Sequence, residues 1–141
     1  MYIFQRRIVF NKSGHPGAPK DYNLDNTEEV YIKTEDNLKL LSWYHKGNNS
    51  LPLLVYFHGN SFHIGDRANR IQRYIEKNWS VLLVSWRGFG GNEGNPTEKN
   101  LYKDAEAVLK WIKNNTEFEF KELVVYGESL GSGAAVEIGT K

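Results

Sequence analysis

The fold is decided by residues 123–133, which read LVVYGESLGSG. A short apolar run, typical of a buried strand, leads directly into G-x-S-x-G with Ser129 at its centre. In a nucleophile elbow this pattern places a serine on a sharp strand-to-helix turn, where Gly127 and Gly131 avoid collisions with the neighbouring backbone. We therefore predict that Ser129 is a nucleophile above a helix N-terminus and that the Leu130 amide donates to a developing oxyanion.

Upstream of this stretch, strands alternate with helices. Residues 53–57 and 80–84 are short, almost continuous apolar runs, as expected of parallel strands that are covered on both faces. Apolar residues at helical spacing predict helices over 64–75 and 101–112, and Thr97 is suited to cap the second. The alternation predicts an α/β fold built from βαβ units around a mainly parallel sheet.

The N-terminal part of the chain has a different pattern. Residues 1–28 form an irregular lead-in, whose second half is rich in proline, glycine and polar side chains, and residues 29–141 form the domain proper. Within that domain, residues 30–34 and 38–44 are predicted to be two strands joined by a tight turn at 35–37. The length of the chain fits one domain rather than two.

Composition narrows the range of functions. The 141 residues include 18 Lys and Arg against 17 Asp and Glu, and a net charge of +1 argues against a nucleic-acid partner. The absence of cysteine excludes disulfides, cysteine nucleophiles and thiolate metal sites. No apolar stretch reaches the length of about 18 residues needed to span a bilayer, and no signal-peptide pattern occurs. Localisation is left open between the cytoplasm and a membrane surface.

The loop after the first of these apolar strands reads HGNSFH, from His58 to His63. Where a nucleophile elbow follows a later strand, a His-Gly pair at this place is suited to position a second oxyanion donor. Gly59 is expected to let the backbone turn so that the amide of Asn60 or Ser61 faces the site. His58 is expected to order this loop by hydrogen bonding rather than to act as a base, and no carboxylate stands at a spacing that would complete a metal site.

Two glycine-rich stretches suggest nucleotide binding as an alternative. Residues 87–96 match no phosphate-binding motif, and we interpret them as a structural loop in which Arg87 pairs with a carboxylate. The spacing of Gly127, Gly131 and Gly133 resembles the cofactor loop of short-chain dehydrogenases. Only eight residues follow Gly133, however, which is too few for the strand and acidic residue that a dinucleotide site requires. No cofactor is predicted.

These features together resemble the α/β-hydrolase superfamily, and within it the serine-aminopeptidase-like or dienelactone-hydrolase-like group. The resemblance runs from about Phe4 to Lys141 and rests on the elbow, on FHGN at 57–60, on WRGFG at 86–90 and on Asp104-Ala105. It implies strand order 1-2-4-3-5 with an antiparallel second strand.

The resemblance also carries expectations about the site. It implies Ser129 as the nucleophile and the amides of Leu130 and Asn60 as the oxyanion hole. The implied substrate is a small-molecule ester, thioester or amide, or a peptide.

One departure from the family concerns the oxyanion loop. Ser61 and Phe62, which we expect to line the substrate site, and His63 replace the smaller residues common there. The shape of the acyl pocket is therefore expected to differ from that of other members.

The catalytic triad is incomplete within this sequence. In this fold the acid and then the histidine follow the serine, whereas after Ser129 the chain has Glu137 as its one acid and no histidine. We therefore expect residues 29–141 to be the N-terminal part of a longer hydrolase domain, inactive by themselves. Some members carry a segment resembling Phe4-Gln5-Arg6-Arg7 after a membrane anchor, which makes membrane association of the longer protein a further expectation. A non-catalytic binding module on the same fold is the alternative.

Overall fold

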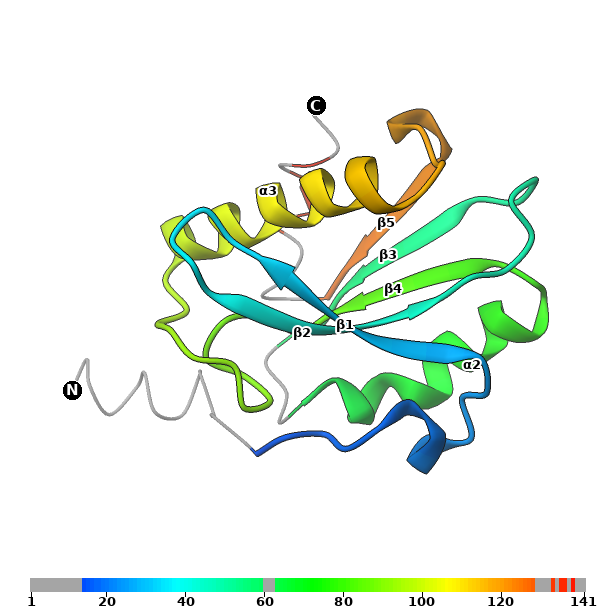
Figure 1. The fold of residues 1–141 in the computed structure, drawn as a ribbon, viewed down its shortest axis with the longest axis horizontal. Helices are drawn as coiled ribbons and strands as arrows, with labels where there is room; N and C mark the ends of the chain where they lie inside the picture. Colours follow the sequence, from blue (N-terminus) through cyan, green and yellow to red (C-terminus); the bar gives the residue numbers. More distant parts are fainter. Residues whose placement is uncertain (1–13, 60–62, 129–132, 134, 137, 139–141) are drawn as a thin grey trace.

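Five strands form one sheet in the computed structural model, which describes residues 14–59, 63–128, 133, 135, 136 and 138 (Figure 1). The strands are β1 (Thr27–Lys33), β2 (Lys39–His45), β3 (Leu53–Phe57), β4 (Ser80–Val84) and β5 (Leu123–Gly127). Their order across the sheet is β1-β2-β4-β3-β5. β2 is antiparallel to β1 and β4, whereas β3 is parallel to β4 and β5. The predicted order and the antiparallel second strand are confirmed, and the described sheet is mixed.

Helices cover both faces of this sheet. α2 (Ala68–Glu76) lies on one face and α3 (Glu98–Asn115) on the other (Figure 1). Alternate residues of β3 point to opposite faces, because side chains alternate along a strand: Val55 and Phe57 pack in the core under α3, and Leu54 and Tyr56 in the core under α2. Every residue of β3 and β4 is buried, which explains their nearly continuous apolar sequence.

The helix predicted over 64–75 is divided in the structure. Residues Ile64–Arg67 form a 3-10 turn, η2, and the α-helix begins only at Ala68. The turn is closed by the Asp66 amide, which donates to the His63 carbonyl over 3.2 Å. The second helix agrees with its prediction, and Thr97 caps it by accepting a hydrogen bond of 3.2 Å from the Asn100 amide.

The β1–β2 hairpin starts earlier than predicted, because β1 begins at Thr27 rather than at Val30. Thr27 pairs with His45, and the Thr27 hydroxyl lies 3.2 Å from His45 Nδ1. The residues just before Val30 are polar and lack the apolar pattern of a strand, so the sequence did not predict the first residues of β1. β1 tolerates them because it is an edge strand of the described sheet, with a strand neighbour on one side.

Part of the lead-in packs against the sheet. A short 3-10 helix, η1 (Pro19–Tyr22), precedes β1, and the Tyr22 ring lies 5.3 Å from the Trp43 ring, centroid to centroid. Leu24 is buried in the core under α2. A further 3-10 turn, η3 (Phe120–Glu122), leads into β5.

β5 is less buried than its apolar sequence predicts. Val124 and Tyr126 are 41% and 46% exposed, whereas their register partners Leu54 and Tyr56 on β3 are buried. β5 has a hydrogen-bonded strand neighbour on one side within the described sheet, so its side chains are screened less than those of β3. In the described part of the chain, no helix has both the length and the apolar character to cross a membrane.

Candidate active site

The carboxyl ends of three parallel strands lie side by side. Phe57 at the end of β3 is in register with Val84 of β4 and with Gly127 of β5. The Glu128 amide then donates to the Phe57 carbonyl over 3.0 Å. The loops after these strands therefore start at one edge of the sheet, which is where α/β folds build their binding and catalytic sites.

The predicted site residues fall into two groups. The structure places His58, Gly59 and Gly127 at this edge. The others lie outside the described residues: Asn60, Ser61, Phe62, Ser129, Leu130 and Gly131. The described residues at this edge flank the predicted nucleophile and oxyanion loop.

His58 is fully buried and is hydrogen bonded through both ring nitrogens. Its Nε2 accepts from the Trp86 amide over 3.2 Å, so Nδ1 has the proton and donates to the Gly59 carbonyl over 2.6 Å. The Trp86 indole in turn donates to the His58 carbonyl over 2.9 Å. Burial lowers the pKa of His58 to about 4, which keeps the imidazole neutral near neutral pH. A neutral ring with both nitrogens engaged is suited to holding the loop, not to shuttling protons.

Glu128, the residue before the predicted nucleophile, reaches across to the loop after β3. Its Oε1 accepts from the Gly59 amide over 3.0 Å and from Arg67 Nε over 2.6 Å. Its Oε2 accepts from the Tyr56 hydroxyl over 2.6 Å and from Arg70 Nη1. We call Glu128, Tyr56, Gly59, Arg67 and Arg70 the Glu128 cluster. One carboxylate therefore joins the end of β5 to β3, the 3-10 turn and α2.

The electrostatics of the cluster favour the ionised carboxylate. Burial by itself would raise the pKa of Glu128, but hydrogen bonds from Tyr56, Arg67 and the Gly59 amide outweigh it and lower that pKa. The same environment raises the pKa of Tyr56 to about 12, through burial and its hydrogen bond to Glu128. Glu128 is an anion and Tyr56 a neutral donor at physiological pH.

The Glu128 cluster was not predicted from the sequence, because the residue between the glycine and the serine of G-x-S-x-G is not specified by the motif. One signal was present: Arg67 and Arg70 stand three residues apart, a spacing that places two side chains on one face of a helical segment. A nearby anion would stabilise two cations on one face, but the sequence does not show which of the 17 acidic residues supplies it.

The space around Gly59 in the cluster is tight. A Cβ atom at Gly59 would lie 3.2 Å from Glu128 Cβ, closer than ordinary van der Waals contact. A larger residue at position 59 would therefore require Glu128 to shift by a few tenths of an ångström.

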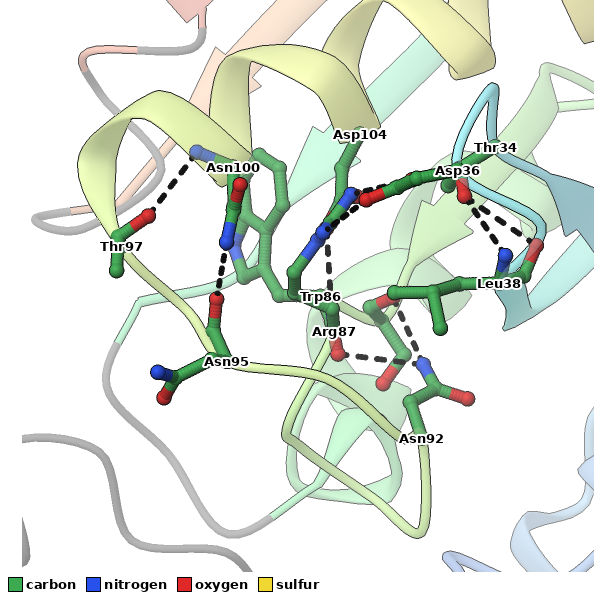
Figure 2. Close-up of polar contacts among 11 residues, drawn as sticks. Thr34, Asp36, Leu38, Trp86, Arg87, Asn92, Asn95, Thr97, Asn100 and Asp104 are labelled. Atoms are coloured by element: carbon green, nitrogen blue, oxygen red, sulfur yellow. Dashed lines mark hydrogen bonds and ion pairs between the residues drawn. The ribbon is translucent and has the colours of Figure 1, made fainter.

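The loop after β4 is held by a separate ionic network (Figure 2). Arg87 Nε donates to Asp104 of α3 over 2.8 Å, and Nη1 donates to Asp36 of the hairpin turn over 2.8 Å. The Asp104 carboxylate also accepts from the Arg87 amide over 3.0 Å. The hydrogen bonds from Arg87 and Thr34 hold the pKa of Asp36 well below its ordinary value. The predicted pairing of Arg87 with a carboxylate is confirmed.

Asn92 links this loop to β2. Its side-chain amide donates to the carbonyls of Ser85 and Trp86 over 3.0 and 3.2 Å (Figure 2). Its Oδ1 accepts from the Leu41 amide over 3.0 Å. One side chain therefore ties the returning loop both to the end of β4 and to the neighbouring strand.

A glycine is required where this loop turns back on itself. Gly88 has φ of +80°, and a Cβ there would lie 2.8 Å from Pro96 Cδ. Close packing of the loop thus explains this glycine without a phosphate ligand.

Among the described residues, no group of three or more histidine, aspartate or glutamate side chains is arranged to hold a metal ion. Buried polar side-chain atoms without a hydrogen-bond partner in that part of the chain are Trp43 Nε1, His63 Nδ1 and Ser85 Oγ.

The strand order, the two helical layers and the converging loops define an α/β-hydrolase fold. An α/β-hydrolase from Vibrio vulnificus superimposes with a TM-score of 0.81 at 22% identity, over 96% of this chain and 50% of that one. The esterase Pf2001 of Pyrococcus furiosus superimposes with a TM-score of 0.68 at 27% identity, over 89% of this chain and 50% of that one. The profile of the family described as serine aminopeptidase, S33, matches residues 49–141, and the chain belongs to this family.

Relatives are found in bacteria and eukaryotes. The uncharacterized protein Rv2307c of Mycobacterium tuberculosis is 32% identical over 100% of this chain and 52% of its own length. The uncharacterized membrane protein YNL320W of Saccharomyces cerevisiae is 30% identical over 100% of this chain and 51% of its own length. The lysophosphatidylserine lipase ABHD12 of Danio rerio is 28% identical over 85% of this chain and 36% of its own length. The chain spans about half the length, or less, of these relatives.

Proposed function

We propose that the chain supplies the nucleophile and the oxyanion hole of a serine hydrolase. Ser129 attacks the carbonyl carbon of an ester, thioester or amide, and the amides of Leu130 and Asn60 stabilise the resulting oxyanion. The observation that supports this most directly is the hydrogen bond of 3.0 Å between the Gly59 amide and Glu128, because these two residues immediately precede the proposed oxyanion donor and the proposed nucleophile.

The surroundings of the nucleophile have proposed roles as well. Gly127 and Gly131 permit the sharp turn at Ser129, and Ser61 and Phe62 line the substrate site. A serine and a phenylalanine side chain there would shape the space that receives the acyl group.

The rest of the triad is proposed to follow this chain in a longer protein. The chain spans about half the length of its relatives, which supports its being one part of such a protein. A later histidine would take the proton of Ser129 and return it to the leaving group, and an acid would orient that histidine. Water would then release the acyl group. His58 does not fill this role, because both its ring nitrogens are already engaged.

The proposed organisation is a lead-in over residues 1–28, the last two of which already belong to β1, followed by the first part of the hydrolase domain over 29–141. The names of the relatives, one a lipase and one a membrane protein, support an ester substrate and membrane association of the whole protein. Both are proposals for this protein.

A fluorophosphonate probe tests the proposed nucleophile on the whole protein. We expect one adduct, located at Ser129 by peptide mass spectrometry. The Ser129→Ala variant should lose the adduct, because the probe reacts with an activated serine hydroxyl. The matched control is Ser132→Ala, which removes another serine of the same stretch and should keep the adduct. A folded whole protein without an adduct at Ser129 would refute the proposal and would favour a non-catalytic binding module.

A further inference from the structure

We propose that Glu128 is a positioning residue, whose carboxylate holds the oxyanion loop in register with the nucleophile elbow. The inference rests on the proposed function, because a loop position matters to catalysis only if Ser129 reacts there. It concerns a residue that would not itself touch the substrate.

The hydrogen bond between Gly59 and Glu128 lies where the two loops must be aligned. Glu128 is adjacent in sequence to Ser129, and Gly59 is adjacent to Asn60. The bond from the Gly59 amide to Glu128 Oε1 therefore joins the immediate neighbours of the two groups that must cooperate. The Gly59 carbonyl also accepts from His58 Nδ1 over 2.6 Å. The backbone before the proposed oxyanion donor is thus held at both its amide and its carbonyl.

The Glu128 carboxylate is itself held at both oxygens. Arg67 binds Oε1 over 2.6 Å, while Tyr56 and Arg70 bind Oε2. The side chain is 11% exposed, so it has little freedom to turn away from Gly59. Hydrogen bonds to an ionised acceptor are also stronger than those between neutral groups. The carboxylate is therefore a rigid support for the loop.

Charge within the cluster depends on the same carboxylate. Arg67 and Arg70 supply two positive charges against the single negative charge of Glu128. Removing that anion would leave two arginines without the counter-ion they share and a Gly59 amide without its acceptor. The cluster would then rearrange, and the loop would lose its connection to the elbow.

A graded series of variants of the whole protein tests this inference: Glu128→Ala, Glu128→Gln and, as the matched control, Glu117→Gln on the exposed segment after α3. We expect kcat to fall about 10- to 100-fold in Glu128→Ala with KM changed less than about threefold, since small misplacements at a reacting centre cost up to about 100-fold. Glu128→Gln should recover part of the loss, because its amide oxygen can still accept from Gly59. Glu117→Gln should match the wild type.

A second readout separates positioning from general damage to the fold. A trifluoromethyl ketone forms a tetrahedral adduct with the serine, and its affinity should fall in proportion to kcat across the series, because both depend on the oxyanion hole. If the substitutions only reduced the amount of correctly folded protein, fewer sites would bind the ketone. The affinity of each remaining site for the ketone would then be unchanged. That result would overturn the inference.

Two further variants keep the inference testable if the substitutions at Glu128 do not fold. Tyr56→Phe and Arg70→Gln each remove one support of Oε2 and leave the Gly59 hydrogen bond in place. We expect each to lower kcat severalfold with KM nearly constant, and values within about twofold of the wild type would overturn the inference. Failure of the wild type to label at Ser129 would refute the proposed function instead, so the two failures are distinguishable.

Discussion

Two ionic clusters stand at the same edge of the sheet, and they differ in depth. The Arg87 network is sealed, since the side chains of Arg87 and Asp104 are 3% and 0% exposed. In the Glu128 cluster, Arg70 is 58% exposed while Glu128 is 11% exposed. The first network ties the loop after β4 to α3 and to the hairpin turn, and the second ties the end of β5 to the loop after β3. From this difference we expect the sealed network to serve mainly stability and the open one mainly alignment.

The largest expected effect is the loss of stability caused by a substitution in the sealed Arg87 network. Asp104→Asn leaves Arg87 buried with the partly exposed Asp36 as its remaining carboxylate partner among the described residues. Removing one member of a buried ion pair commonly costs about 3–5 kcal/mol, because the remaining desolvated charge loses its buried counter-ion. We expect a loss of that size in the free energy of unfolding of the whole protein, measured with urea.

The matched control for this substitution is Asp36→Asn, on the same arginine. Because Asp36 is exposed, its loss should cost about 1 kcal/mol or less. Equal effects of the two substitutions would remove the distinction between sealed and open ion pairs on which the comparison depends.

The next effect concerns the buried neutral His58. In the unfolded chain the imidazole takes up a proton below about pH 6.5, whereas in the folded protein it does so only near a pKa of about 4. The unfolded state therefore binds more protons between these values, so stability falls as the pH falls through this window, by roughly 3 kcal/mol in total.

Urea unfolding at several pH values measures this effect. The difference in stability between wild type and His58→Gln should shrink as the pH falls from about 6.5 to about 4, because glutamine does not titrate. The exposed His15→Gln variant should keep the slope of the wild type. A His58→Gln slope equal to that of the wild type would show that His58 does not remain neutral in the fold.

The smallest expected effect is on the stability of the open cluster. Glu128→Gln should lower the free energy of unfolding by only about 1 kcal/mol, since Arg70 is largely exposed and the glutamine oxygen can still accept from Gly59 and Arg67. The lowered pKa of Glu128 means that its contribution is present above about pH 4.3 and is lost as the pH falls through the folded value. Urea unfolding at neutral pH measures the loss. A value as large as that of Asp104→Asn would mean that the Glu128 cluster, too, is mainly a structural element.

The buried strands and the helix cap were predictable because each depends on residues that are close together in the sequence. Residues 53–57 and 80–84 are almost entirely apolar and became the fully buried strands β3 and β4. Thr97 was recognisable as a helix cap because its side chain needs only an amide three residues away. The turn at Ile64–Arg67 was missed, since its apolar spacing fits an α-helix and a 3-10 turn almost equally well.

The candidate site was predictable only in part. G-x-S-x-G and the His-Gly pair indicated the loops, and the resemblance to a family indicated their roles. The partners of Arg87 and Glu128 could not be predicted, because Asp36 lies 51 residues from Arg87 and Glu128 lies 61 residues from Arg67. No local spacing rule connects residues so far apart in the chain.

The sequence by itself determined that this chain alternates buried strands with amphipathic helices and follows β5 with a G-x-S-x-G motif, because hydrophobic periodicity and turn chemistry act over a few residues. Only the tertiary structure decided which charges meet. Parallel pairing of β3 with β4 and β5 brings three strand ends to one edge, and there Glu128 meets Gly59 and two arginines. The physical reason is that a carboxylate finds its donors through space, and the space is set by the packing of the whole sheet.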